Sequence, residues 1–196
     1  MLDYSEQMHR LIRVIVERSS EFAHIDVDRI LVSLTSARNN SSYGLYAKLA
    51  PLRFEGGMRD KRVRGVTYRM PRIEMNGHDI LYIVYFCMPR FQDQSLRNKF
   101  ATIFHELYHI SPEFNGDLRR FDGRNAIHGS SSKRYDEKMA LFADDYMDRY
   151  PDCPIHAFLD LDFDELGRRY GDVVGLKIKE PRPVAIRHRN PFRNRG

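Results

Sequence analysis

The sequence has little of what secreted, disulfide-rich or membrane-spanning proteins need. Only two cysteines occur among its 196 residues, Cys87 and Cys153, and they lie far apart. A disulfide framework or a cysteine-based zinc site is therefore not expected, and a reducing cytoplasm is the predicted location. No apolar run approaches the roughly 20 residues that a membrane-spanning helix needs. The N-terminal stretch mixes charges into its apolar positions, so no signal peptide is expected.

What is present suffices for one ordinary globular domain. Hydrophobic residues make up 42% of the chain and charged residues 30%, which is typical of a folded rather than a disordered protein. A chain of this length can bury a sizeable core, and it contains no internal repeat. We predict one domain over residues 1–175, followed by a basic C-terminal tail over residues 176–196.

Positive charge is concentrated in two segments. The net charge is +5, and residues 176–196 carry seven Lys or Arg against one Glu. A second basic run, RFEGGMRDKRVRGVTYRMPR, covers residues 53–72. Such segments can hold nucleic acid through phosphate contacts, although more often they are solvated faces or tails. No motif that reads DNA or RNA accompanies the charge, so nucleic-acid binding through the tail is kept as a weaker hypothesis.

Hydrophobic periodicity predicts an α+β domain with a small sheet that is mainly antiparallel or mixed. The expected elements, in chain order, are a helix (4–19), strands (28–36, 43–54, 64–70 and 79–88), a helix from about residue 94, a glycine-containing loop (115–131) and helices at 133–149 and 163–170. The apolar run DILYIVYFCM, residues 79–88, is the clearest strand.

The helix that begins near residue 94 carries an H-E-x-x-H motif, in the stretch ATIFHELYHI. With eight His and ten Glu in the chain, chance would produce this motif in roughly one of 60 such sequences. On helical spacing one side of this helix is an apolar seam of Leu96, Phe100, Ile103, Leu107 and Ile110. His105 and His109 project from the opposite side. Two neutral imidazoles four residues apart can bind one tetrahedral zinc ion. Glu106 lies on the flank of the same face, where it can act as general base toward a zinc-activated water.

Two histidines leave such a site incomplete, and the sequence offers more than one further ligand. Pro112 ends the helix soon after His109. The loop that follows reaches His128 after 18 intervening residues, so that His128 is the favoured third ligand. Glu137, on the next predicted helix, is the alternative, and Asp136 is a further one.

Residues 105–129, HELYHISPEFNGDLRRFDGRNAIHG, resemble the signature of the phage metallopeptidases, a small zincin-like family of prokaryotes and their viruses. The resemblance implies a compact zincin-like fold and a zinc peptidase of the HExxH type. It also implies that His105, His109 and His128 are metal ligands and that Glu106 is the catalytic base. No resemblance extends beyond about residue 150, and none supplies a substrate.

The function predicted from these residues is that of a cytoplasmic zinc metallopeptidase, a hydrolase acting on a peptide or protein substrate without a membrane partner. Residues 79–88 are expected to form a sheet edge that pairs with extended substrate backbone. Arg124, Asn125 and Tyr135 are candidates for stabilising the tetrahedral oxyanion. The alternative is a DNA-associated or regulatory zinc protein, similar to SprT-like or repressor-cleaving proteins, in which the basic tail contacts nucleic acid.

Overall fold

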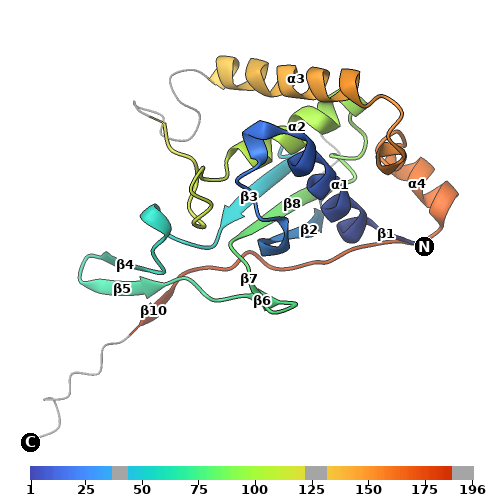
Figure 1. Cartoon of the computed structure of the whole chain (residues 1–196). Helices are drawn as coiled ribbons and strands as arrows, with labels where there is room; N and C mark the ends of the chain where they lie inside the picture. Colours follow the sequence, from blue (N-terminus) through green and yellow to red (C-terminus); the bar gives the residue numbers. More distant parts are fainter. Residues whose placement is uncertain (37–43, 122–131, 187–196) are drawn as a thin grey trace, which may run out of the picture.

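Strand β8 forms the centre of the main sheet and determines where the other elements pack. The computed structural model describes residues 1–36, 44–121 and 132–186 (Figure 1). β8 (Tyr82–Met88) is buried along its whole length and pairs in parallel with β2 (Ile30–Ser36) and antiparallel with β3 (Ala47–Pro51). A strand with neighbours on both sides and cover on both faces has an uninterrupted apolar sequence, as YIVYFCM does.

Helices cover one face of this sheet (Figure 1). α1 (Tyr4–Arg18) and α2 (Leu96–Tyr108) pack on the sheet, and α3 (Ser132–Arg149) packs across α2. α4 (Phe163–Tyr170) begins with a capping box and buries Leu166 in the same core. Within the described ranges, no helix has the length and apolar character that crossing a membrane requires.

The opposite face of the sheet is covered by extended segments. Leu176 and Ile178 pack against a second buried cluster, which consists of Leu31, Ala50, Leu52, Ile80, Ile83 and Tyr85. The backbone N–H of Leu34 donates to the carbonyl oxygen of Leu176 at 2.7 Å. The first residues of the segment predicted as a tail therefore lie along β2.

Three small sheets complete the fold. They pair β1 (Leu2–Asp3) in parallel with β9 (Val173–Val174), β6 (Glu74–Met75) antiparallel with β7 (His78–Asp79), and β5 (Val66–Arg69) antiparallel with both β4 (Asp60–Val63) and β10 (Val184–Ile186). Single turns of 3-10 helix occur at Ser20–Phe22, Val27–Arg29, Glu55–Gly57 and Pro154–His156.

The predicted α+β class and mixed sheet are confirmed, and the predicted helices and main strands are present. The prediction that residues 79–88 form a sheet edge is wrong. β8 lies between β2 and β3, and its backbone hydrogen bonds on both sides are taken by these neighbours. The edges of the main sheet are β2 and β3. The boundary between residues 175 and 176 stays a prediction.

A tight turn follows α2 and returns the chain past the end of that helix. Gly116 adopts φ +88° at this turn. Its N–H donates to the hydroxyl of Tyr82 at 2.9 Å, and that hydroxyl donates to the carbonyl oxygen of Asp117 at 2.8 Å. Ile110 then pairs with Leu118 in an antiparallel bridge. The loop is thus attached to the central strand.

Gly116→Ala should lower the free energy of unfolding by about 2–4 kcal/mol. A Cβ there would lie 3.0 Å from Cβ of Arg53 and 3.2 Å from Cδ2 of Leu81, at a φ that L-residues rarely adopt. Arg53 cannot move aside easily, because it is buried and ion-paired with Asp79. The measurement is denaturant-induced unfolding.

Gly56→Ala is the matched control for this variant. Gly56 also has a positive φ, +69°, but a Cβ there meets no atom within 4 Å. Its substitution should cost only the backbone contribution, about 1 kcal/mol. An equal loss of stability in the two variants would contradict the packing argument.

Candidate metal centre

α2 presents its apolar seam to the core and its histidines to α3. Ser95 caps the helix, its Oγ accepting a hydrogen bond from the N–H of Asn98 at 3.4 Å. Four of the five predicted seam residues, Phe100, Ile103, Leu107 and Ile110, are each at most 1% exposed, and Leu96 is partly buried. Packing of this seam leaves the opposite side of α2, including both motif histidines, to face α3 and the solvent.

His105 and His109 lie side by side at the C-terminal end of α2. Their ring centroids are 4.7 Å apart, His109 is buried, and the side chain of His105 is 27% exposed. The ring of Tyr135, from α3, stacks on His109 with centroids 5.5 Å apart. The Tyr135 hydroxyl lies 3.3 Å from Nδ1 of His109 and 3.3 Å from the carbonyl oxygen of His105. Tyr135 therefore fixes the orientation of the buried imidazole.

The Tyr135 hydroxyl keeps its proton at neutral pH. Burial raises the pKa of Tyr135 well above its ordinary value, because the charged phenolate would be poorly solvated there. Its position beside His109, rather than in open solvent, suits a residue that orients this imidazole.

Glu106 lies on the other flank of the motif, against the edge strand β3. The side chain is 6% exposed, and its carboxylate accepts a hydrogen bond from the backbone N–H of Leu49. Tyr46 and Leu52 direct their backbone bonds toward β8. Backbone groups along a strand point alternately to its two sides, and Leu49 lies three residues from both Tyr46 and Leu52. The N–H of Leu49 therefore points away from β8. Burial raises the pKa of Glu106 to about 7, and the Leu49 N–H opposes that shift.

A cleft of about 340 Å³ opens beside these residues. Its walls come from residues 44–47, from the outer side of α2 and from Asp136 and Met139 of α3. His105 and Glu106 both line it. A ligand in this cleft would therefore meet one motif histidine and the motif carboxylate together.

The predicted third ligand, His128, lies outside the described residues. The same holds for Arg124 and Asn125, two of the candidates for the oxyanion. Within the ranges 1–36, 44–121 and 132–186, no group of three or more His, Cys, Asp and Glu side chains is arranged to hold a metal ion. The structure thus brings together His105, Glu106 and His109, and the completion of the site stays a prediction.

The two acidic alternatives on α3 differ in their placement. Glu137 lies on the exposed side of the helix, 3.9 Å from the amine of Lys133, and is not brought to the histidine pair. Asp136 has Oδ1 at 3.6 Å from Nδ1 of His105. Of these two carboxylates, Asp136 is the one in reach of a motif histidine.

The described residues on both sides of the segment that contains His128 lie close to the histidine pair. The N–H of Arg119 donates to the carbonyl oxygen of His109 at 2.7 Å. The ring of Phe121 lies 6.2 Å from the rings of both Tyr108 and Tyr135. The described chain therefore stops at Phe121 and resumes in α3 beside the same pair of histidines.

The two imidazoles would suit a metal ion that prefers nitrogen donors, such as zinc. Two adjacent imidazoles, one of them buried and oriented by a tyrosine, are the nitrogen donors that zinc prefers at about 2.0–2.1 Å. The carboxylate of Glu106 lies on the flank of the pair, where it accepts a hydrogen bond from the backbone N–H of Leu49. Sequence reasoning could not find this bond, since its donor is a backbone atom 57 positions earlier in the chain.

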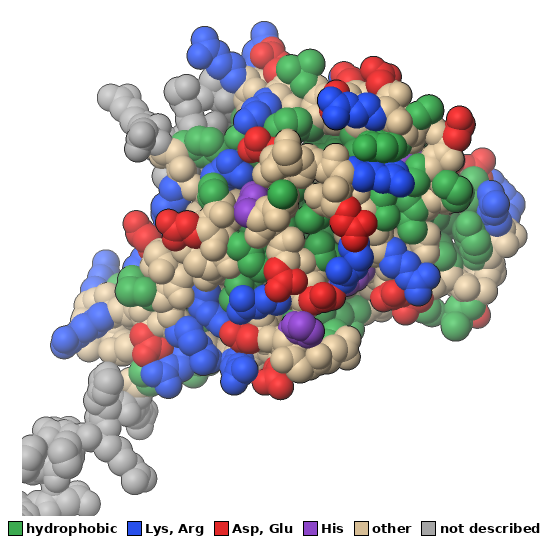
Figure 2. All heavy atoms as spheres, in the orientation of Figure 1, with side chains coloured by type: hydrophobic (Ala, Val, Ile, Leu, Met, Phe, Trp, Pro, Cys, Tyr) green, Lys and Arg blue, Asp and Glu red, His purple; other side chains and the backbone are tan. Residues whose placement is uncertain are grey.

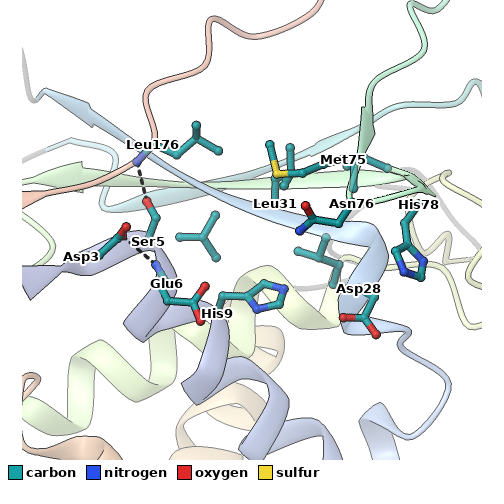
Figure 3. Close-up of a pocket in the computed structure, with 13 residues that line it drawn as sticks. Asp3, Ser5, Glu6, His9, Asp28, Leu31, Met75, Asn76, His78 and Leu176 are labelled. Carbon is teal, nitrogen blue, oxygen red and sulfur yellow. Dashed lines mark hydrogen bonds between the residues drawn. The ribbon is translucent and has the colours of Figure 1, made fainter.

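A second hollow in the fold carries no comparable chemistry. It measures about 380 Å³ and lies between α1, β2 and the β6–β7 hairpin (Figure 3). Its polar side chains serve the local structure: Asp3 caps α1, Asp28 pairs with Arg13, and His9 bonds the carbonyl oxygen of Val27 at 3.0 Å. This hollow is therefore a structural feature of the helix–sheet junction.

Comparison with known proteins relates the chain to one family. The family described as "Putative phage metallopeptidase" matches residues 3–137, which is well over half of the chain. The match includes α2 and all three motif residues. No curated protein and no solved structure matches the chain.

Proposed function

The chain belongs to the phage metallopeptidase family, and we propose that it is a zinc-dependent endopeptidase of the HExxH type. The observation that supports the proposal best is the constellation on α2. His105 and His109 adjoin each other at 4.7 Å between ring centroids, with Glu106 buried beside them on the wall of one cleft. The free thiols of Cys87 and Cys153 are consistent with a reducing cytoplasm as the place of action.

His105 and His109 would hold the zinc ion through neutral imidazoles, with His128 as the third ligand. When bound, zinc supplies a Lewis acid that polarises the scissile carbonyl and lowers the pKa of a water molecule. Tyr135 would keep the His109 ring in the orientation that binding requires. Asp136, beside Nδ1 of His105, would do the same for the other ring.

Glu106 would act as the general base. Its carboxylate lines the cleft and is held by the Leu49 N–H, so it is positioned before substrate arrives. It would accept a proton from the attacking water and deliver it to the nitrogen of the leaving amine. The exclusion of solvent around a side chain only 6% exposed strengthens its interaction with developing positive charge.

Edge strand β3 replaces residues 79–88 as the proposed site of backbone recognition. In the described part of the chain, no strand pairs with the side of β3 opposite β8. Ala47 lines the cleft and directs its backbone groups to that side, on which the N–H of Leu49 already donates to Glu106. An extended peptide could add to this edge by main-chain hydrogen bonds, which require no particular side chain.

The test of the proposed function is metal content. Purified protein should contain close to one zinc per chain by elemental mass spectrometry, and the double variant His105→Ala, His109→Ala should contain almost none. His78→Ala, which removes an exposed histidine of β7, is the matched control and should keep its zinc. An unchanged zinc content in the double variant would show that His105 and His109 do not bind the metal.

A further inference from the structure

The two basic segments of the sequence meet in one small sheet, although more than 100 residues separate them. β5 pairs with β10, so that Arg69 lies opposite Val184 and Thr67 opposite Ile186. Residues 59–72 carry six Lys or Arg against one Asp, and residues 176–186 carry three against one Glu. Figure 2 shows these cationic side chains gathered at the end of the molecule formed by β4, β5 and β10.

Most of this positive charge is not neutralised by neighbouring carboxylates. Arg69 pairs with Asp60 at 2.7 Å, and Arg72 pairs with Glu74 and Asp79. Among the described residues, seven further cations of these two segments form no ion pair: Arg59, Lys61, Arg62, Arg64, Lys177, Lys179 and Arg182. A surface with this excess attracts a polyanion.

The β4–β5 hairpin carries its charges on both faces and at its tip. Lys61 and Arg62 are consecutive in β4 and therefore point to opposite faces. Arg64 and Gly65, with φ +48° and +82°, form the turn. No residue of β4 or β5 is buried, so the ribbon is accessible from both sides. Toward its tip, beyond the residues of β5 that pair with β10, the hairpin is a two-stranded ribbon, which fits a groove of duplex DNA with phosphates on either side.

A pocket of about 370 Å³ lies between the main sheet and residues 177–180, the first part of the second basic segment. Lys48, Lys177 and Lys179 line it together with Glu180, which is ion-paired with Lys48. Tyr85 also lines it, is 3% exposed, and has no hydrogen-bond partner for its hydroxyl. Burial raises the pKa of Tyr85 to about 12, so the hydroxyl can donate. Lys177 and Lys179, which form no ion pair with described residues, together with the unpaired hydroxyl donor of Tyr85 suit a phosphate.

We propose that β4, β5, β10 and residues 177–182 form a surface that binds the phosphate backbone of double-stranded DNA. Lys179 and Val184 are five residues apart, at most about 18 Å, so hairpin and pocket can contact one duplex. β4, β5 and β10 lie at the end of the molecule away from α3, and residues 177–182 run along the sheet face opposite the helices, so the surface does not cover the cleft beside α2 (Figure 1). The inference does not depend on peptidase activity.

The test is fluorescence anisotropy of the full chain with a labelled 20-base-pair duplex, between 50 and 200 mM NaCl. The wild type should bind with an affinity that falls steeply as salt rises. The hairpin variant Lys61→Gln, Arg62→Gln, Arg64→Gln should bind at least about tenfold more weakly, and its salt slope should fall by roughly 0.9 for each phosphate that the variant no longer neutralises. Lys177→Gln, Lys179→Gln should also reduce the slope.

The matched control removes three exposed arginines from α1, α3 and α4: Arg10→Gln, Arg149→Gln, Arg168→Gln. It carries the same net charge as the hairpin variant and should bind nearly as the wild type does. If the two triple variants weaken DNA binding equally, the proposed surface is wrong. The absence of DNA binding by the wild type at 50 mM NaCl would also contradict it. Arg64→Gln alone, at a solvent-exposed turn, should weaken binding without changing thermal stability. Tighter binding to anionic lipid vesicles than to DNA would also contradict the proposal.

Discussion

Glu106→Gln should lower kcat for peptide hydrolysis by about 10²–10⁴-fold and leave the zinc content at one per chain. Glutamine has nearly the same shape and can still accept a hydrogen bond from the N–H of Leu49, the contact that holds this side chain in place. It cannot accept the proton of the attacking water. The loss should therefore fall on catalysis, while substrate binding along β3 is retained.

The measurement combines peptidase kinetics with elemental analysis of the same protein samples. Glu113→Gln is a suitable control, because that carboxylate lies beyond the end of α2 and bonds the side chain of Asn115. Thermal unfolding should show that the Glu106 variant is folded. Loss of zinc in Glu106→Gln would indicate that Glu106 is a metal ligand. An undiminished kcat would show that another residue acts as the general base.

The main helices and strands could be predicted because their signals are local. The seam Phe100, Ile103 and Leu107 predicts which side of α2 is buried, and it thereby predicts where His105 and His109 project. The partners of these side chains could not be predicted in the same way. The bond between Glu106 and Leu49 depends on the register of β3 against β8 and on how α2 crosses that edge.

The position of β8 was mispredicted although the sequence contained a signal for it. Seven consecutive buried residues, Tyr82–Met88, are typical of a strand with cover on both faces and neighbours on both sides. An edge strand more often carries charges that discourage further pairing. β3 has such a charge in Lys48, and β4 has three, in Asp60, Lys61 and Arg62.

The meeting of the two basic segments is a feature that only the tertiary structure reveals. Each segment by itself is typical of a solvated face. The alternation of Leu176 and Ile178 does indicate that the second segment begins as a half-buried extended stretch, which agrees with its packing on β2 and the second core. The pairing of β10 with β5 has no local signal in the sequence, because the two strands lie more than 100 residues apart along the chain.

The third ligand can be identified by graded losses of zinc affinity, measured by competition with a chromophoric chelator. His128→Ala should weaken binding by more than about 100-fold, because loss of a direct ligand exceeds the roughly 10- to 100-fold cost of losing a residue that orients one. Asp136→Ala should fall within that smaller range, since its carboxylate lies 3.6 Å from Nδ1 of His105. Glu137→Ala should leave affinity nearly unchanged, because Glu137 is exposed and lies near Lys133.

His128 is favoured over the two carboxylates for reasons of placement and of charge. The residues that precede and follow its segment, Phe121 and Tyr135, have ring centroids 6.2 Å apart beside the histidine pair, so a return of the chain to the metal requires no rearrangement of α3. Three neutral imidazoles leave the ion its full double charge, which favours ionisation of a bound water more than a carboxylate ligand would. If Asp136→Ala abolishes binding while His128→Ala preserves it, the ligand set is two histidines and an aspartate. If Glu137→Ala abolishes it, α3 must rotate its exposed side inward when metal binds, and the orientation of Tyr135 against His109 described above would not survive in the metal-bound protein.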